Sequence, residues 1–397
     1  MSYKALSTAE DGVEPTKHES KKQFSVSFIY TSVLISALLV TVGLFALSTS
    51  SVFDSYTSTS TEERLQLAMD GSIPYSNLKD KEKTALFTKF KSMYGREYTS
   101  DEDEFRFTNF KKNLELIDTR NAKEKAKGFN DDDRATHGIN KFADKSEDEL
   151  KALRGFVPGD EDSAKYRKAK KGPKLDSYTD DGDDYATVDW RDVLTTSVKD
   201  QGYCGSCWAF SATSQIESDS IRAGYLTVAD ADKLSEQQMV SCDTYDSGCD
   251  GGNPYYAYYY VYKTGGLELN VTYPYTSYWD DDGTCLSDSS EYKVTVTDYY
   301  YLSSETAMEA HVSSTGPLSV CVDASDWASY TGGVVHTCGT DVDHCVQAVG
   351  LNSGRNYWII RNSWGTNWGE KGYIYLEAGE NLCDITYLPT YVAVEKV

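Results

Sequence analysis

Positive charge and histidine are both scarce in this sequence. The 397 residues include 39 Lys+Arg against 62 Asp+Glu, so the formal net charge is −23. A nucleic-acid-binding protein needs surplus basic side chains to neutralise phosphates, and this balance excludes nucleic acid as the default partner. Only five histidines are present, and the nine cysteines are spaced widely and irregularly after residue 200. That pattern argues against a zinc site, so we expect neither a metal nor a cofactor.

The charge is unevenly distributed along the chain. Residues 81–174 carry a net charge of +4, whereas residues 184–397 carry 10 Lys+Arg against 30 Asp+Glu, a net charge of −20. One interpretation is two solvated surfaces of different composition. The other is a basic segment that binds the acidic one within the same chain.

An uncharged stretch near the N-terminus predicts a membrane anchor. No Asp, Glu, Lys, Arg or His occurs from Gln23 to Phe53, and an apolar stretch of ~20 residues is enough to span a bilayer. We expect a cytosolic tail (1–22), a transmembrane signal-anchor (23–48) and a Ser/Thr-rich stalk (49–80), with a cleaved signal peptide as the alternative. Lysines precede the stretch, so the rest of the chain is expected on the lumenal or extracellular side, which permits disulfides.

Hydrophobic periodicity predicts an α+β protein. Apolar residues at spacings of three and four indicate helices from Lys81 to about Leu153, and a charged, Gly- and Pro-containing linker follows at 158–185. After Trp190, helix-like segments are followed by strand-like ones. The helix-like segments are 207–224, 254–263 and 305–314, and the strand-like ones are 318–322, 346–351, 357–360 and 373–376.

The segment from Gln201 to Phe210 reads QGYCGSCWAF and carries the chemical signal. Cys207 opens a periodic segment, so its sulfur lies at a helix N-terminus, where the helix dipole favours a thiolate. A thiolate nucleophile needs an imidazole to accept and deliver the proton. His344 is the candidate, with Asn362 following a strand-like segment 18 residues later. The rival bases, His311 and His336, are predicted to be surface residues.

These motifs, with DHCVQAVG around His344 and RNSWGTNWG around Asn362, resemble the papain-like cysteine peptidases over residues 185–397. The resemblance implies a two-lobed fold, one lobe mainly helical and one a β-barrel, spanning residues 186–397. It implies Cys207 as nucleophile, His344 as general base and then acid, and Asn362 as the residue that orients the imidazole. Gln201 and the Cys207 backbone N–H would form the oxyanion hole, and Trp364 would shield the His–Asn hydrogen bond.

A second set of motifs lies upstream and resembles cathepsin-L-like propeptides. Six residues fall at steps of three and four along one side of a long helix, and a Gly-x-Asn-x-Phe-x-Asp motif follows. An amphipathic helix packed for stability alone is the alternative. The resemblance implies an inhibitory prodomain at 81–157 whose following segment crosses the cleft in the non-cleavable direction. The motif residues are Glu102, Arg106, Phe110, Asn113, Ile117, Asn121, Gly138, Asn140, Phe142 and Asp144.

Substrate recognition and disulfide pairing are also implied by the resemblance. Gly251 and Gly252 would bring backbone against a substrate strand, and a side-chain pocket would set specificity, with Leu388 limiting it to aliphatic residues. The pocket positions are Asn253, Pro254, Cys321, Val342, Cys345 and Leu388. The implied disulfides are Cys204–Cys249, Cys242–Cys285 and Cys338–Cys383. Cys321 and Cys345 remain, either as a fourth disulfide or as two buried thiols.

The sequence thus predicts a cysteine endopeptidase made as a membrane-anchored zymogen and activated at acidic pH. Its expected partners are protein and peptide substrates, its own propeptide and a membrane, and its expected destination is an acidic endolysosomal or vacuolar compartment. Asn270 begins the only glycosylation sequon, Asn-Val-Thr. The alternatives are a catalytically silent, membrane-tethered protein that keeps the fold for binding, and a disulfide-bonded structural module on a stalk.

Overall fold

The computed structural model describes residues 60–131, 133–159, 170–172 and 187–397. The predicted membrane anchor at 23–48 lies outside these residues. Among the helices in the described ranges, none combines the length and apolar character that crossing a membrane requires.

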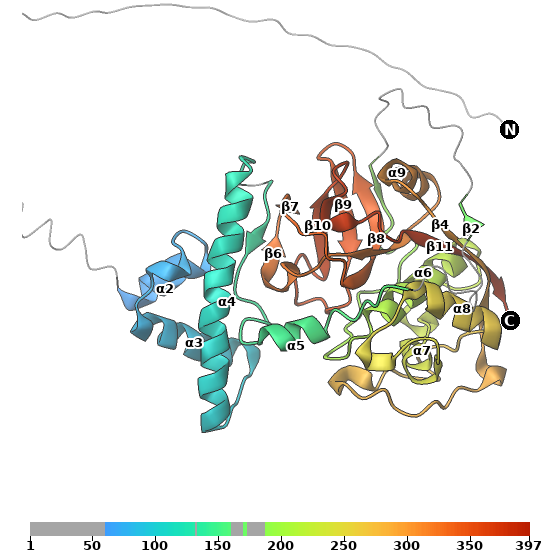
Figure 1. Cartoon of the computed structure of the whole chain (residues 1–397), viewed down its shortest axis with the longest axis horizontal. Helices are drawn as coiled ribbons and strands as arrows, with labels where there is room; N and C mark the ends of the chain where they lie inside the picture. The colour runs from blue at the N-terminus through green and yellow to red at the C-terminus, as the bar shows by residue number, and fades with distance from the viewer. Residues whose placement is uncertain (1–59, 132, 160–169, 173–186) are drawn as a thin grey trace, which may run out of the picture. The chain divides into compact units, whose positions relative to one another are not determined.

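Residues 60–157 form the helical region, shown in blue to green in Figure 1. The longest helix, α4, has three acidic residues in its first turn and two lysines in its last, which suits the helix dipole. The elements of the helical region are α2 (Thr61–Met69), η1 (Tyr75–Asn77), α3 (Asp80–Tyr94), α4 (Ser100–Ala126), β1 (Thr136–His137) and α5 (Glu147–Ala152).

The predicted stalk is wrong from residue 61 onward. α2 begins after Ser60, whose hydroxyl accepts a hydrogen bond from the Glu63 amide. Leu65 and Tyr75 are buried in the same apolar core as Phe90 of α3 and Phe110 of α4. The apolar face of α2 therefore belongs to the helical region, because burial in that core outweighs the polar composition of the segment.

Residues 187–397 form the C-terminal region, which has two lobes (Figure 1). The mainly helical lobe packs α6 and α8 around one core, and the barrel lobe packs a twisted sheet around another. The helices are α6 (Cys207–Arg222), η2 (Asp230–Asp232), α7 (Glu236–Cys242), η3 (Gly248–Asp250), α8 (Pro254–Thr264), η4 (Ser277–Trp279), η5 (Ser289–Glu291), α9 (Glu305–Ser314), η6 (Trp327–Ser329) and η7 (Leu382–Asp384). The strands are β3 (Val188–Asp189), β4 (Val294–Tyr301), β5 (Leu318–Val322), β6 (Tyr330–Gly332), β7 (Val334–Val335), β8 (His344–Asn352), β9 (Tyr357–Arg361), β10 (Tyr373–Glu377) and β11 (Thr390–Lys396).

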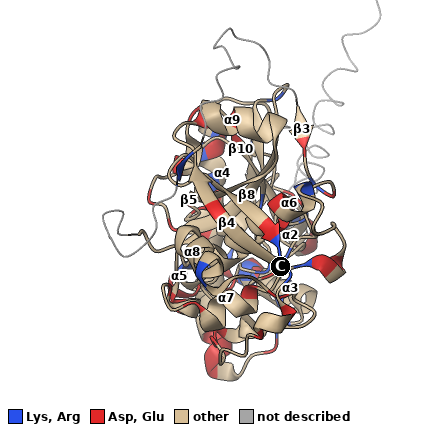
Figure 2. Cartoon of the chain, turned by 90° about the vertical axis from the view of Figure 1, so that its right-hand side faces the viewer, with Lys and Arg blue, Asp and Glu red and all other residues tan. Residues whose placement is uncertain are grey.

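The strands form one large sheet and one small one. The large sheet has the order β2-β4-β11-β5-β8-β9-β10-β7, with β3 paired to β8, and its edge strand β2 (Lys170–Lys171) comes from the predicted linker. The small sheet pairs β1 of the helical region with β6 of the C-terminal region. Figure 2 shows Asp and Glu positions distributed over the C-terminal region. The α+β prediction is confirmed, and the two regions are joined by backbone pairing as well as by side chains.

Candidate active site

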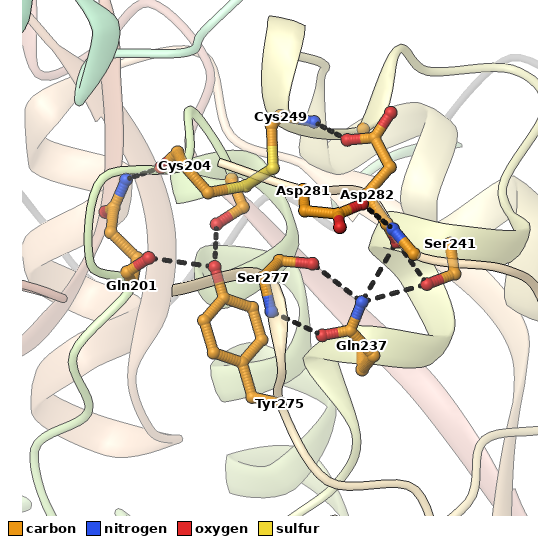
Figure 3. Close-up of a disulfide and its surroundings, with 12 residues drawn as sticks. Gln201, Cys204, Gln237, Ser241, Cys249, Tyr275, Ser277, Asp281 and Asp282 are labelled. Atoms are coloured by element: carbon orange, nitrogen blue, oxygen red, sulfur yellow. Dashed lines mark hydrogen bonds between the residues drawn. A yellow bond between two sulfur atoms is a disulfide. The ribbon is translucent and has the colours of Figure 1, made fainter. Parts of the chain in front are cut away.

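Cys207 is the first residue of α6, at the N-terminus where the sequence predicted it. A disulfide between Cys204 and Cys249 ties the preceding turn to η3, as Figure 3 shows. The Cys207 thiol is fully buried, and this burial raises its pKa to about 12. In this form of the chain, desolvation of Cys207 therefore outweighs the helix dipole that was predicted to favour a thiolate.

His344 opens β8, and Asn362 follows the neighbouring antiparallel strand β9. The His344 Nε2 lies 2.8 Å from the Asn362 Oδ1, while the buried His344 Nδ1 has no hydrogen-bond partner in the described part of the chain. The Trp364 ring packs against His344 with 4.9 Å between centroids and is itself buried. Burial lowers the pKa of His344 to about 4 against the opposing effect of Asn362. Both Cys207 and His344 are thus neutral near pH 7 here.

The other two histidines of the C-terminal region are buried, so the prediction that they are surface residues is wrong. His311 is 4% exposed on α9 and packs against Tyr391. His336 is 5% exposed, and its Nδ1 lies 2.9 Å from a Glu377 carboxylate oxygen. Each histidine ring is covered by residues distant in the sequence, so the polarity of its own segment does not predict its burial.

The Gln201 side chain points at the backbone of the helical region. Its Nε2 donates to the Leu153 carbonyl at 2.9 Å, and its Oε1 accepts from the Ser363 hydroxyl at 2.6 Å. Gln201 is fully buried by these contacts. The amide predicted to hold an oxyanion therefore already holds a carbonyl oxygen.

The predicted pocket residues meet around Phe156. Cys321 of β5 and Cys345 of β8 stand opposite each other in register and form a disulfide. Phe156 packs on that pair, with Val342 and Leu388 on the rim. In this form of the chain the pocket holds an aromatic ring, and the limit of substrates to aliphatic side chains stays a prediction.

Residues 153–157, which we call the cleft strand, cross the site beside Gly252. The Gly252 amide donates to the Gly155 carbonyl at 2.8 Å, and the Val157 amide donates to the Gly252 carbonyl at 2.9 Å. The bridge between Phe156 and Gly252 is parallel. Gly155 lies so close to Gly205 that an added Cβ would be 1.8 Å from the Gly205 carbonyl oxygen, so only glycine fits at position 155.

The remaining pocket positions lie beside the cleft strand. Asn253 donates from Nδ2 to the Val157 carbonyl at 3.3 Å, and its Oδ1 caps α8 through the Tyr255 amide. Pro254 is the first residue of α8, and Gly251 precedes the bridging glycine with φ of 115°. The structure therefore gathers the predicted binding residues at one cleft.

The motif residues of α4 hold the segment that leads to the cleft strand. Arg106 donates to both Glu149 carboxylate oxygens at 2.7 Å, and Asn113 donates to the carbonyls of Ala143 and Lys145. Asn121 exchanges two hydrogen bonds with the His137 backbone. Glu102 pairs with Arg106 on the same helix, and Phe110 and Ile117 are buried in the helical core.

The Gly-x-Asn-x-Phe-x-Asp motif at residues 138–144 contacts both the helical region and the C-terminal region. The Gly138 amide donates to the Ser329 carbonyl, and Asn140 donates to the Ala328 carbonyl. Phe142 packs edge-on against Trp364 with 5.4 Å between ring centroids, and Asp144 hydrogen-bonds Tyr98. The motif residues thus position the helical region on the active site.

We call the contacts of α4 and residues 137–140 with residues 325–337 the docking face. Arg120 donates to the Asp326 carboxylate at 2.8 Å, and His137 Nδ1 lies 3.0 Å from the Ser329 hydroxyl. Burial and the nearby Arg120 lower the pKa of His137 to about 3. Glu124 accepts from the His336 and Thr337 amides. Arg120, Glu124 and His137 carry no local sequence signal for these contacts, because their partners lie about 200 positions away.

All eight cysteines other than Cys207 are paired. The three implied disulfides, Cys204–Cys249, Cys242–Cys285 and Cys338–Cys383, are present along with Cys321–Cys345, and Cys207 is free. Asn270 lies half-buried in a turn, with its amide bonded to Lys233 and its Oδ1 to the Tyr275 amide. No group of three or more His, Cys, Asp or Glu that could hold a metal occurs within the described ranges.

The fold and this site define a cysteine protease in its zymogen form, with an inhibitory segment over a buried thiol. Residues 185–393 match the papain family cysteine protease model, and residues 87–150 match the cathepsin propeptide inhibitor domain (I29) model. The chain belongs to the papain family of cysteine proteases.

Named relatives agree with this assignment. Cysteine proteinase B of Leishmania mexicana is 40% identical over 79% of this chain and 69% of its own length. Cysteine protease XCP2 of Arabidopsis thaliana is 38% identical over 77% of this chain and 85% of its own. The solved structure of digestive procathepsin L2 from Tenebrio molitor has a TM-score of 0.68 and 32% identity, and the match covers 78% of this chain and 99% of that one.

Proposed function

We propose that this zymogen yields an endopeptidase in which Cys207 is the nucleophile, His344 the general base and acid, and Asn362 the residue that orients His344. The Cys207 sulfur attacks the scissile carbonyl carbon while its proton passes to His344 Nδ1. Gln201 and the Cys207 amide hold the oxyanion, and His344 returns the proton to the leaving amine. Water then hydrolyses the thioester by the same proton transfers in reverse.

The observation that carries this proposal is the path of the cleft strand. Leu153 places a carbonyl on the Gln201 amide, and Phe156 fills the pocket that Cys321 and Cys345 line. These are the places that a substrate carbonyl and side chain would take. The strand runs parallel to Gly252, so we infer that substrates run antiparallel to it and that the cleft strand escapes cleavage by its direction.

Acid release follows from the docking face. His137 has a lower pKa in the docked form than the ordinary 6.5, so the docked form binds fewer protons than the released one and acid favours release. Its contribution to docking is complete above pH ~6.5 and declines as the pH falls toward ~3. Burial would raise the pKa of Asp326, but Arg120 and Lys123 outweigh it and lower that pKa, so this ion pair also weakens in acid.

Labelling with an epoxide inactivator of thiol proteases tests the proposal. The precursor is incubated at pH 4.5 or 7.5, then treated with the inactivator at a common pH and digested for mass analysis. We expect modification of Cys207 after acid treatment, little at pH 7.5, and none in Cys207→Ala. Failure to label Cys207 after conversion to the mature form would favour a protease-fold binding protein without turnover.

We further infer that the precursor is attached to a membrane through residues 23–48, with the described residues on the lumenal or extracellular side. The mature form would then act in an acidic endolysosomal or vacuolar compartment. Four disulfides among the described residues support an oxidising environment. Carbonate extraction of the precursor, with N-terminal sequencing, tests this. Recovery in the soluble fraction with residues 23–48 present would overturn it.

A further inference from the structure

The two sides of the candidate active site are covered by different parts of the helical region. Phe156 lies in the side-chain pocket, and Leu153 lies on Gln201. Residues before Leu153 therefore extend away from the pocket, past the position of the scissile carbonyl. In the proposed reaction, this is the side on which the leaving amine and the residues after it would lie.

An aromatic shelf, formed by Tyr203, Tyr278 and Trp279, borders this second side. Trp279 stacks on Tyr203 with 5.3 Å between centroids and an interplanar angle of 22°, and Tyr278 meets Tyr203 edge-on. Trp279 is 74% exposed even in the zymogen. Most of the Trp279 ring is therefore open to a ligand.

Carboxylates surround the aromatic shelf. Asp200 hydrogen-bonds the Gly202 amide beside Tyr203, and Asp280 directly follows Trp279. Burial and the nearby carboxylates of Asp250 and Asp282 raise the pKa of Asp280. Negative charge beside aromatic faces is a combination that favours a cation.

Two lysines of the helical region already occupy this surface. Lys145 Nζ lies 4.4 Å from the centroid of the Tyr203 ring, and Lys141 Nζ lies 3.0 Å from an Asp200 carboxylate oxygen. Both leave with the helical region on activation. The surface then loses two cations and keeps its own rings and carboxylates.

The aromatic shelf is bonded rigidly to the predicted oxyanion hole. The Tyr203 amide donates to the Tyr278 carbonyl at 2.8 Å, and the Tyr275 hydroxyl donates to the Gln201 carbonyl at 2.8 Å. Figure 3 shows the Tyr275 hydroxyl pointing toward Gln201, with the Cys204–Cys249 disulfide above them in this view. A side chain held on this shelf would therefore be held at a constant position relative to the scissile bond.

We propose that in the mature protease this surface is a subsite for a lysine or arginine side chain on the leaving-group side of the scissile bond. The inference rests on the proposed peptidase function. The cation would stack on the Tyr203–Trp279 pair and face Asp200, because in the zymogen Lys145 lies over Tyr203 and Lys141 pairs with Asp200.

Matched fluorogenic peptides test the proposal. They share the sequence before the scissile bond and carry lysine, norleucine or glutamate in turn at each of the first three positions after it. For the mature enzyme we expect kcat/KM to be about tenfold higher with lysine than with norleucine at one position, and lowest with glutamate. The lysine preference should shrink at high salt, because part of it is Coulombic.

Two variants locate the effect. Trp279→Ala and Asp200→Asn should each lower the lysine-to-norleucine ratio of kcat/KM about threefold. Leu286→Ala, which removes another exposed apolar side chain (73% exposed), is the matched control and should keep the ratio.

The outcomes separate the two proposals. Hydrolysis of the norleucine peptides with no lysine preference at any position, or a preference that survives both substitutions, overturns the subsite and leaves the protease. Absence of hydrolysis of every peptide by enzyme whose Cys207 labels normally would count against both.

Discussion

The helical region holds the C-terminal region in two places, by two kinds of contact. At the docking face the contacts are charged or titratable, namely Arg120 with Asp326 and the buried His137 with Ser329. In the cleft strand they are backbone hydrogen bonds to Gly252 and the apolar packing of Phe156. Acid weakens the contacts of Arg120 with Asp326 and of His137 with Ser329, and leaves the backbone and apolar contacts nearly unchanged. Docking thus responds to pH, while occlusion of the site depends on shape.

One ion pair in the cleft strengthens this contrast. Arg154 Nε lies 2.7 Å from an Asp343 carboxylate oxygen. Burial raises the pKa of Asp343 despite Arg154, so acid does not favour release there. Glu124 opposes release at the docking face in the same way, because burial raises its pKa too. The net response to acid depends on His137 and Asp326 outweighing these two carboxyls.

The largest effect is expected from Gly155→Val. The new Cβ would meet the Gly205 carbonyl at 1.8 Å, and backbone cannot yield as a side chain can. The cleft strand must leave the site, so the activity of the intact precursor at pH 7.5 should rise at least a hundredfold. Gly354→Val is the control, because an added Cβ there meets only the Asn352 side chain, at 3.6 Å. If the intact Gly155→Val precursor stays inactive at pH 7.5, close packing of the cleft strand is not what keeps substrate out.

The next largest effect concerns His137→Gln. Glutamine can hydrogen-bond Ser329 but does not titrate, so the acid-dependent loss of docking should disappear. Protonation of His137 from pH 6.5 to pH 4.5 spans two pH units, which is worth about 2.7 kcal/mol, or roughly a hundredfold in the docking equilibrium. Conversion at pH 4.5 should slow by up to that factor, with the midpoint at lower pH. A conversion profile that superimposes on the wild type would exclude His137 as the acid-sensitive group.

A smaller effect is expected from Arg120→Ala. Arg120 is 8% exposed and bonds Asp326, Ser329 and the Ser325 carbonyl, and its loss leaves those partners unpaired at the interface. The conversion rate at pH 6 should rise about tenfold. Lys123→Ala is the matched control, because Lys123 is 3.7 Å from Asp326 and its side chain is 56% exposed. Equal effects of the two variants would mean that net charge, rather than these buried contacts, governs docking.

The smallest effect concerns the pocket. Replacing Cys321 and Cys345 together by Ala removes the wall on which Phe156 packs. We expect the ratio of kcat/KM for substrates with Phe and Leu at the pocket position to change about fourfold, because the difference is about that of one buried methylene, ~0.8 kcal/mol. An unchanged ratio in correctly folded enzyme would show that Val342 and Leu388 alone set the preference.

Local patterns were enough to predict some elements and failed for others. α9 and β5 have the predicted bounds, because their apolar periodicity is bounded by polar or Gly-Pro residues. α2 was missed although Ser60 and Glu63 form a recognisable helix start. The buried state of His311 and His336 could not be predicted, because it depends on Tyr391 and Glu377.

In the candidate site, too, some features could be predicted from the sequence and others could not. The resemblance paired His344 with Asn362, which the structure shows hydrogen-bonded, and the catalytic roles of Cys207 and Gln201 stay predictions. The resemblance implied that the segment after the prodomain crosses the cleft. It did not imply that the Leu153 carbonyl would bind Gln201 or that Phe156 would fill the pocket. No periodicity or charge pattern marks a chain that binds by its backbone.

Strand β2 makes the position of the activating cut matter for the finished enzyme. Lys170 and Lys171 pair with Tyr300 and Tyr301 at the end of the large sheet, as Figure 1 shows beside β4. A cut before Lys170 leaves β2 attached to the mature enzyme as the edge strand of the large sheet. A cut after Lys171 removes it and bares the main chain of β4, and an unpaired strand can recruit another chain. Two mature products with one active site would then differ in solubility and self-association.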